Sequence, residues 1–118
     1  MHRFNCPCCN YPTLEERRGW EICCLCNWED DGKDDPLADK VWGGPNPDYS
    51  LTEARENFKK RYIMYRDRRR ILKQTNKEIQ TKRNLINAFE KLRTANNEST
   101  QQIWQEIDSF EKELYKLN

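Results

Sequence analysis

The chain has 118 residues, of which 35% are charged and 36% are hydrophobic, and its formal net charge is +1. So low an apolar share excludes a large globular core and favours a small domain joined to helices with solvated faces. No apolar run is long enough to span a membrane, and the N-terminus has no apolar segment of an export signal, so we expect a cytoplasmic protein.

The near-neutral charge conceals two segregated runs. Residues 29–39 hold six acidic side chains and one lysine, whereas residues 55–73 hold nine basic side chains and two acidic ones. An acidic loop followed by a basic helix therefore describes the chain better than its net charge does.

Two copies of one short pattern lie near the N-terminus. Residues 6–10 and residues 23–27 both contain Cys-x-x-Cys-Asn, and the second copy follows the first by seventeen residues. A Cys-x-x-Cys pair places two thiolates at one tight turn, where a tetrahedral zinc ion can bind them. The two pairs together predict one structural zinc ion per chain.

The asparagine after each pair selects the ligands among six cysteines. A knuckle of this kind turns back through a residue with positive φ, a conformation that asparagine tolerates better than most residues. The equal offset in both copies assigns four ligands: Cys6, Cys9, Cys23 and Cys26. Cys8 and Cys24 are left over, and we interpret them as thiols that lie near the metal; the alternatives are that they are redox-active or that they substitute as ligands. Disulfides are the alternative, but the lack of an export signal favours reduced thiols.

Short arms flank each cysteine pair, and Arg18-Gly19 predicts the turn between them. The large apolar residues of this stretch are expected to form a thin layer around the metal: Phe4, Tyr11, Leu14, Trp20, Ile22 and Trp28. Such a layer is too small to fold alone, so the metal is expected to supply the missing stability. The pattern is typical of a zinc ribbon. Residues 31–49 follow as an acidic loop rich in Gly and Pro, with Val41-Trp42 as its one anchor.

A capping box at Ser50–Glu53 predicts the start of a helix. From there to about Arg93 no Gly or Pro occurs, and an apolar residue recurs every seven positions: Leu51, Phe58, Tyr65, Leu72, Ile79 and Ile86. This spacing predicts one long helix that packs as a coiled coil, with Gln74–Asn76 as the candidate hinge.

Asn96-Asn97 predicts a turn, and Ser99–Gln102 is a second capping box. The helix that follows has one apolar face: Ile103, Ile107, Phe110, Leu114 and Leu117. A matching stripe lies on the preceding helix: Leu85, Ile86, Phe89 and Leu92. We therefore expect an antiparallel helical hairpin. The predicted fold is a small α+β protein, with a zinc-ribbon head and acidic loop over residues 1–49 and a helical hairpin arm over residues 50–118.

Several ordered motifs resemble the bacterial cysteine-rich CPCC family, over about residues 3–60. They are Cys-Pro-Cys-Cys at 6–9, Glu-Ile-Cys at 21–23, Cys-Asn-Trp-Glu-Asp-Asp at 26–31, Gly-Gly-Pro-Asn at 43–46 and Ser-Leu-Thr-Glu-Ala-Arg-Glu-Asn at 50–57. The resemblance implies a four-cysteine metal site and no established enzymatic activity. The chain departs from the family at Cys24, where proline is usual, and at the asparagine after each knuckle, where glycine is more usual.

The sequence offers little for catalysis. A site filled by four protein ligands is structural, and His2, the one histidine of the chain, lies at the terminus, so a general base for a nucleophile is lacking. The enzymatic alternative is a magnesium-dependent nuclease that uses the acidic run: Glu29, Asp30, Asp31, Asp34 and Asp35. Such runs are usually solvated loops, and we expect no enzyme.

We interpret the chain as a non-enzymatic protein-binding module, such as an adaptor, an inhibitor or an immunity-type protein. The first half of the long helix shows apolar groups without evident cover, and two tryptophans flank the acidic run. The loop residues that are candidate contacts with a partner are Trp28 and Trp42. The helix residues that are candidate contacts with the ribbon, a second copy or a foreign partner are Phe58, Tyr62, Met64, Tyr65, Ile71 and Leu72. The alternative for both tryptophans is that they cover the zinc core.

A nucleic-acid-binding regulator is the alternative function. On a continuous helix, five cations would share one face beside the apolar column: Arg55, Lys59, Arg66, Arg70 and Lys73. Such a face can neutralise phosphates. A solvated face, or pairing with the acidic loop, explains the same pattern equally well.

Overall fold

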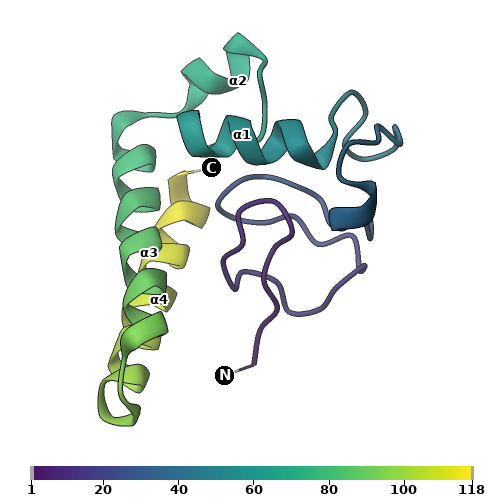
Figure 1. Ribbon diagram of the computed structural model, residues 1–118. Coiled ribbons are helices and arrows are strands. Elements are labelled where there is room, and N and C mark those ends of the chain that lie inside the picture. Colours follow the sequence, from purple (N-terminus) through teal and green to yellow (C-terminus); the bar gives the residue numbers. More distant parts are fainter. Residues whose placement is uncertain (1, 118) are drawn as a thin grey trace. The chain divides into compact units, whose positions relative to one another are not determined.

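The computed structural model describes residues 2–117, and the chain divides into two compact units. The cysteine unit is Met1–Lys73 and the hairpin unit is Gln74–Asn118. The helices are η1 (Asp35–Leu37), α1 (Leu51–Arg61), α2 (Arg68–Lys73), α3 (Asn76–Thr94) and α4 (Asn97–Leu117) (Figure 1). None of the described helices is both long and apolar enough to cross a membrane. We expected the chain to divide after residue 49, but α1 and α2 belong to the same unit as the cysteines.

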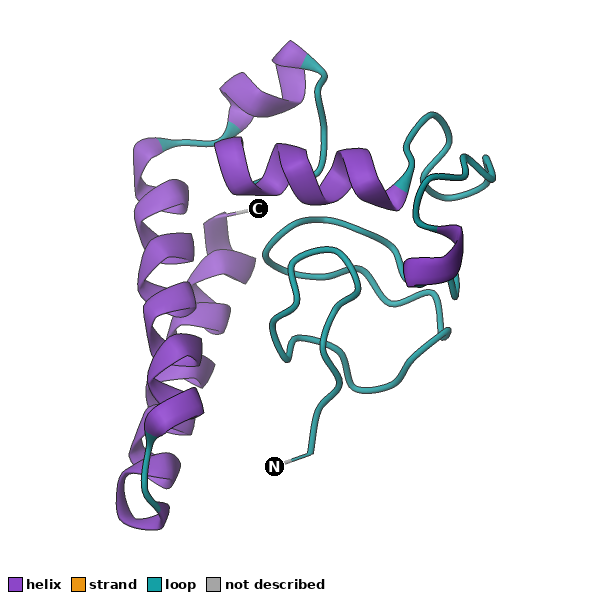
Figure 2. Ribbon diagram, in the orientation of Figure 1, coloured by secondary structure: helices purple, strands orange, loops and turns teal. Residues whose placement is uncertain are grey.

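The two knuckles are held by short backbone pairings rather than by a sheet. Isolated antiparallel bridges join Phe4 to Leu14 and Ile22 to Glu29, and Figure 2 shows helices and loops along the described chain. Each bridge closes an arm around one cysteine pair, as the sequence predicted. The structure does not confirm the expected α+β class, because isolated bridges do not make a strand ladder and the described chain is mostly helical.

The Gly-Gly-Pro-Asn motif docks on the second arm. The side chain of Asn46 accepts a hydrogen bond from the amide of Glu29 (3.2 Å) and donates one to the carbonyl oxygen of Glu29 (2.9 Å). Asn46 therefore pairs with Glu29 as a neighbouring strand residue would. Gly43 and Gly44 both have positive φ, and a Cβ atom at either would meet nothing within 4 Å, so the tip of this loop is open.

The core of the cysteine unit lies between the knuckles, α1 and the segment after α1. Its buried apolar side chains include Leu14, Leu25, Trp28, Leu51, Ala54, Phe58, Ile63 and Met64. The expected layer around the metal is only partly correct, because Phe4, Trp20 and Ile22 are 40%, 59% and 56% exposed. Helix α1 supplies apolar cover that we had assigned to these residues.

Helix α1 begins as its capping box predicted. The hydroxyl of Ser50 accepts a hydrogen bond from the amide of Glu53 (3.0 Å). The carboxylate of Glu53 does not return to Ser50; it binds Arg66 at 2.8 Å instead.

The long continuous helix was a wrong prediction. Helix α1 ends at Arg61, and its C-cap is Tyr62, whose φ of 62° is left-handed. Residues 62–67 separate α1 from α2. The break is held by tertiary hydrogen bonds of Met64, whose amide donates to the carbonyl oxygen of Cys26 (2.9 Å) and whose carbonyl accepts from Asn57 (2.8 Å). Tyr65, which is half-buried in the segment between the two helices, continues the seven-residue pattern, and this explains the error.

The hinge at Gln74–Asn76 is a true break. Thr75 caps α3, and its hydroxyl accepts a hydrogen bond from the amide of Glu78 (3.0 Å). Helices α3 and α4 pack together, and the ion pairs Lys77–Glu113 and Lys91–Glu106 show that they run antiparallel. The predicted stripes supply the core of the hairpin unit: Leu85, Phe89, Ile103, Ile107 and Leu114 are buried, together with Ala88. Helix α4 begins at Asn97, and its cap is Asn96 rather than the predicted Ser99.

Candidate metal centre

Four sulfur atoms meet at the centre of the cysteine unit. The Sγ atoms of Cys6, Cys9, Cys23 and Cys26 all lie within 4.8 Å of one another, and all four residues are buried. They are the four ligands that the spacing assigned. Among the described residues, this is the one cluster of histidine, cysteine or acidic side chains close enough to hold a metal ion.

The distances between the sulfur atoms fit a tetrahedral metal site. Cys6 Sγ lies 3.7 Å from Cys26 Sγ, and Cys9 Sγ lies 3.6 Å from Cys23 Sγ. Four thiolates at the usual zinc–sulfur distance would be separated by about 3.8 Å. The two sulfur atoms of a disulfide would lie about 2.05 Å apart, and all six cysteines are free. The chemistry and spacing of the donors therefore match a metal ion and do not match cross-links.

The two asparagines build the turns as predicted. Asn10 and Asn27 have φ values of 63° and 72°. The amide of Asn10 donates to the carbonyl oxygen of Cys6 (2.8 Å), and the amide of Asn27 donates to that of Cys23 (3.0 Å). Each knuckle therefore closes with the same hydrogen bond and the same left-handed residue, so the two halves of the site share one geometry.

Hydrogen bonds to sulfur come from around the cluster. The hydroxyl of Thr13 donates to Cys23 Sγ (3.1 Å), and the amide of Trp28 donates to Cys26 Sγ (3.4 Å). Such donors reduce the negative charge on a thiolate and fix its direction, as groups behind metal ligands commonly do. Thr13 was not singled out from the sequence, because nothing in its local pattern marks a residue that reaches a cysteine ten positions away.

The environment makes one sulfur easier to ionise than the others. Burial raises the pKa of Cys9 and of Cys26 well above the ordinary value. Burial also opposes ionisation of Cys23, but hydrogen bonds from the other thiols and from Thr13 outweigh it and lower the pKa. Because metals bind thiolates, a metal ion that binds this cluster would displace the protons from its sulfur atoms.

Helix α1 and the segment after it hold the two knuckles from one side. The guanidinium of Arg55 donates from Nε to the carbonyl oxygen of Pro7 (2.9 Å), and the amide of Met64 donates to the carbonyl oxygen of Cys26 (2.9 Å). Arg55 contacts the first knuckle and Met64 contacts the second. Helix α1 and the segment after it therefore help to fix the distance between the two cysteine pairs.

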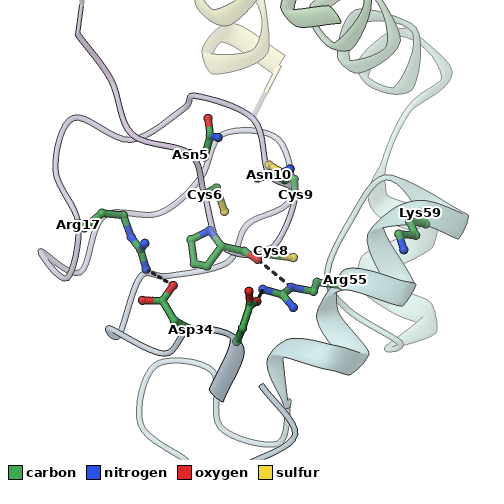
Figure 3. Close-up of a pocket in the computed structure, with 11 residues that line it drawn as sticks. Asn5, Cys6, Cys8, Cys9, Asn10, Arg17, Asp34, Arg55 and Lys59 are labelled. Atoms are coloured by element: carbon green, nitrogen blue, oxygen red, sulfur yellow. Dashed lines mark hydrogen bonds and ion pairs between the residues drawn. The ribbon is translucent and has the colours of Figure 1, made fainter. Parts of the chain in front are cut away.

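A polar pocket of about 470 Å³ adjoins the first knuckle (Figure 3). Three cations line it, and Arg17 and Arg55 are paired with Asp34 and Asp35 on the same wall. A divalent ion bound by four thiolates carries a net charge of about −2, so cations near the first knuckle would stabilise such a centre. The rest of the lining is Asn5, Cys6, Pro7, Cys8, Cys9, Asn10 and Lys59. Cys8 thus lies beside the cluster, outside the four-sulfur set.

The acidic run is a structured loop. Asp30 is fully buried and accepts hydrogen bonds from Arg17 Nε (2.9 Å) and from the amides of Arg18 (2.6 Å) and Gly32 (3.2 Å). Burial alone would raise the pKa of Asp30, but these donors outweigh it and lower the pKa. Of the acids considered as magnesium ligands, Asp30, Asp34 and Asp35 form ion pairs with Arg17 or Arg55. Neither Arg17 nor the buried Asp30 was predicted to pair.

The predicted partner contacts fall into three groups by exposure. Trp28, Phe58 and Met64 are 0%, 7% and 1% exposed, so they are core residues of the cysteine unit and not exposed contacts. Met64 contacts Cys26 of the second knuckle, which agrees with the alternative that this segment packs on the cysteine head. Tyr62, Tyr65 and Ile71 are half-buried. Trp42 and Leu72 remain 49% and 69% exposed. Trp28 therefore covers the four-cysteine cluster, which was the alternative considered from the sequence.

The five predicted basic residues do not form one helical face, because α1 and α2 are separate helices. Arg55 is bound to Pro7 and Asp35, and Arg66 pairs with Glu53 and lies over the ring of Tyr49. Arg70 lies over the ring of Tyr65. Lys59 and Lys73 are exposed. His2 packs edge-on against Phe4, with ring centres 5.1 Å apart.

The fold and the cluster define a small, mostly helical protein whose N-terminal unit is built around a four-cysteine site of metal-binding geometry. Residues 4–78 match the model of the cysteine-rich CPCC family, which is well over half of the chain. The protein therefore belongs to this family. The match continues beyond residue 60, where the resemblance seen in the sequence ended, and so includes α2. Neither the curated proteins nor the solved structures contain a significant match.

Proposed function

We propose that the protein is a non-enzymatic binding module of zinc-ribbon type, in which one structural zinc ion stabilises the unit that presents a protein-binding loop. The observation that supports it best is the pairing of a closed, buried four-cysteine cluster with an exposed tryptophan fixed nearby in the same unit.

Zinc is the metal that the donor set favours. Four thiolates in tetrahedral spacing are the usual ligands of structural zinc, and a site filled by four protein ligands has no position for a substrate. Cys6, Cys9, Cys23 and Cys26 would hold the ion, and when bound it would stabilise the folded unit by roughly 10 kcal/mol or more. A closed site of this kind supports a structural role and not an enzymatic one.

The binding loop is residues 40–47, which we call the Trp42 loop. Val41 and Trp42 are 55% and 49% exposed, and exposed Trp side chains are frequent hot spots of protein interfaces. Trp42 is held in place by the fully buried Lys33. The ammonium group of Lys33 lies 4.9 Å from the centre of the Trp42 ring, and it donates a hydrogen bond to the carbonyl oxygen of Lys40 (2.7 Å). A side chain that is already fixed loses little conformational entropy on binding, so this loop is suited to contact a partner.

A crosslinking experiment tests the proposal. A photoreactive amino acid is placed at Trp42 and, as the control, at Tyr115 on α4, which is 69% exposed. We expect a crosslink to a defined protein, or to a second copy of the chain, from position 42 only. With that protein purified, Trp42→Ala should weaken binding at least tenfold in calorimetry, whereas Tyr115→Ala should change it less than twofold. Equal effects of the two variants, or no crosslink specific to position 42, would overturn the proposal.

A further inference from the structure

Helix α2 is a six-residue helix without a buried residue. So short a helix has no stability of its own, and it needs support from its surroundings. One support is Asp67, whose carboxylate accepts a hydrogen bond from the amide of Arg69 (2.9 Å) and whose carbonyl accepts from the amide of Ile71 (3.0 Å). The helix therefore has a good N-terminal cap but lacks the apolar face that usually holds a helix on a protein.

The second support is a column of alternating cations and rings. Arg70 lies over Tyr65 with 4.1 Å between the guanidinium carbon and the ring centre, and Tyr65 packs edge-on against Tyr49 at 5.6 Å. Arg66 lies over Tyr49 at 4.5 Å. These contacts attach the Arg70 side of α2 to the rest of the cysteine unit. They also occupy the rings of both tyrosines.

The opposite side of α2 carries three cations. At 100° per residue, Arg68, Leu72, Arg69 and Lys73 fall within an arc of about 140°, on the side away from Ile71. All four side chains of this arc are exposed. Within the described part of the chain, Arg68, Arg69 and Lys73 make no ion pair and no side-chain hydrogen bond. By contrast, Arg17, Arg55 and Arg66 of the same unit each pair with a carboxylate.

We propose that this arc of α2 binds the phosphate backbone of duplex nucleic acid without sequence specificity. Like charges this close repel one another, so three unpaired cations on one face cost stability unless an anionic ligand uses them. The helix is about 9 Å long. Over that length a duplex presents several phosphates, since it carries about one charge per 1.7 Å of axis.

The chemistry of the arc selects among anionic partners. A single strand is usually gripped by aromatic rings that stack on bases, whereas this arc holds no aromatic residue, and Tyr65 beneath it is covered by Arg70. Arg68 and Arg69 can each bind a phosphate through two N–H groups. One exposed leucine is too little apolar surface to anchor the helix in a membrane.

Fluorescence anisotropy with a labelled duplex of 20 base pairs tests the proposal on the full-length, zinc-loaded protein. Three neutralised phosphates predict a slope of about −2.7 in a plot of log affinity against log salt, so binding should weaken about 40-fold between 50 and 200 mM NaCl. The variant R68Q/R69Q/K73Q should lose at least tenfold in affinity at 50 mM NaCl and most of the salt slope.

The matched control is K91Q/K112Q/K116Q, which removes the same net charge from exposed positions of the hairpin unit. It should change affinity less than twofold, and Trp42→Ala should leave duplex binding unchanged, which separates this proposal from that of the binding loop. The proposal is overturned if the unaltered protein does not approach saturation by about 100 μM in 50 mM NaCl. It is also overturned if both triple variants lose affinity equally, or if vesicles containing phosphatidylserine bind the protein and the duplex does not.

Discussion

The guanidinium of Arg55 donates a 2.9 Å hydrogen bond from Nε to the carbonyl oxygen of Pro7, inside the first knuckle. This contact spans 48 positions of sequence and joins α1 to the turn that carries Cys6 and Cys9. A second nitrogen of the same side chain pairs with Asp35 at 2.6 Å. The metal site and the first helix are therefore parts of one folded unit, and changes in α1 should be felt at the cysteines.

Arg55→Leu should destabilise the cysteine unit by about 1–2 kcal/mol, because a charge-assisted hydrogen bond to a buried turn is lost. The pair with the largely exposed Asp35 adds little to this figure. Urea unfolding of the zinc-loaded protein measures the change. Lys59→Leu is the control, one turn later on α1 and exposed, and it should change stability by less than about 0.5 kcal/mol. Equal effects of the two substitutions would show that the contact with Pro7 contributes nothing.

Thr13→Val should lower zinc affinity about tenfold, because the hydroxyl that donates to Cys23 Sγ is lost while the shape of the side chain is kept. Competition with a chelator of known affinity measures the effect. Thr13→Ser keeps a hydroxyl and should bind zinc nearly as tightly as the unaltered protein. A valine variant with unchanged affinity would mean that this hydrogen bond does not tune the site.

Asn27→Ala should destabilise the cysteine unit by about 1–2 kcal/mol, because the φ of 72° at this position is strained for a residue with an ordinary side chain. Asn27→Gly should change stability by less than about 0.5 kcal/mol, since glycine adopts positive φ freely. Thermal unfolding of both variants with zinc bound decides between them. If alanine and glycine are equally tolerated, the left-handed turn is not what places asparagine after the cysteines.

Asp30→Asn should cost about 2–3 kcal/mol at neutral pH, because a buried carboxylate that receives four hydrogen bonds is lost and Arg17 loses one of its two carboxylate partners. The folded pKa of Asp30 is lowered, so its stabilisation is fully present above the unfolded value of 3.8 and disappears as pH falls through the folded pKa. The stability gap between the two proteins should be constant from about pH 8 to pH 5 and narrow below that. Asp48→Asn, in an exposed position, should leave stability nearly unchanged. A gap that widens on acidification would contradict the assigned pKa direction.

The sequence was most informative where local chemistry decides the structure. The two knuckles, their asparagine turns and the four ligands could be predicted because each depends on residues within one tight turn. The pairing of α3 with α4 could be predicted for a similar reason: both helices carry apolar stripes of matching length next to a short turn. In both cases the residues whose sequence pattern predicted the structure are the same residues that form the turn or the helix interface.

The prediction of one long helix failed because contacts between distant segments of the chain determine where α1 ends. Nothing in the local pattern of residues 62–67 ends a helix. The left-handed turn at Tyr62 is held by two hydrogen bonds of Met64, one donated to Cys26 and one accepted from Asn57. The seven-residue apolar spacing runs through this segment because Tyr65, which lies between the two helices, still packs against Tyr49. One local signal was available but unused: Thr75 and Glu78 form the same capping pattern as Ser50 and Glu53, and they mark the start of α3.

We propose that Cys6, Cys9, Cys23 and Cys26 hold one zinc ion and that this ion stabilises the cysteine unit. Native mass spectrometry of the purified protein, with elemental analysis of the same sample, tests it most directly. We predict one zinc ion per chain, lost in Cys9→Ser and in Cys23→Ser together with the folded structure of the cysteine unit, and retained in Cys24→Ser. A purified protein without metal, or a variant that keeps its zinc after either ligand substitution, would show that these four cysteines do not hold a zinc ion.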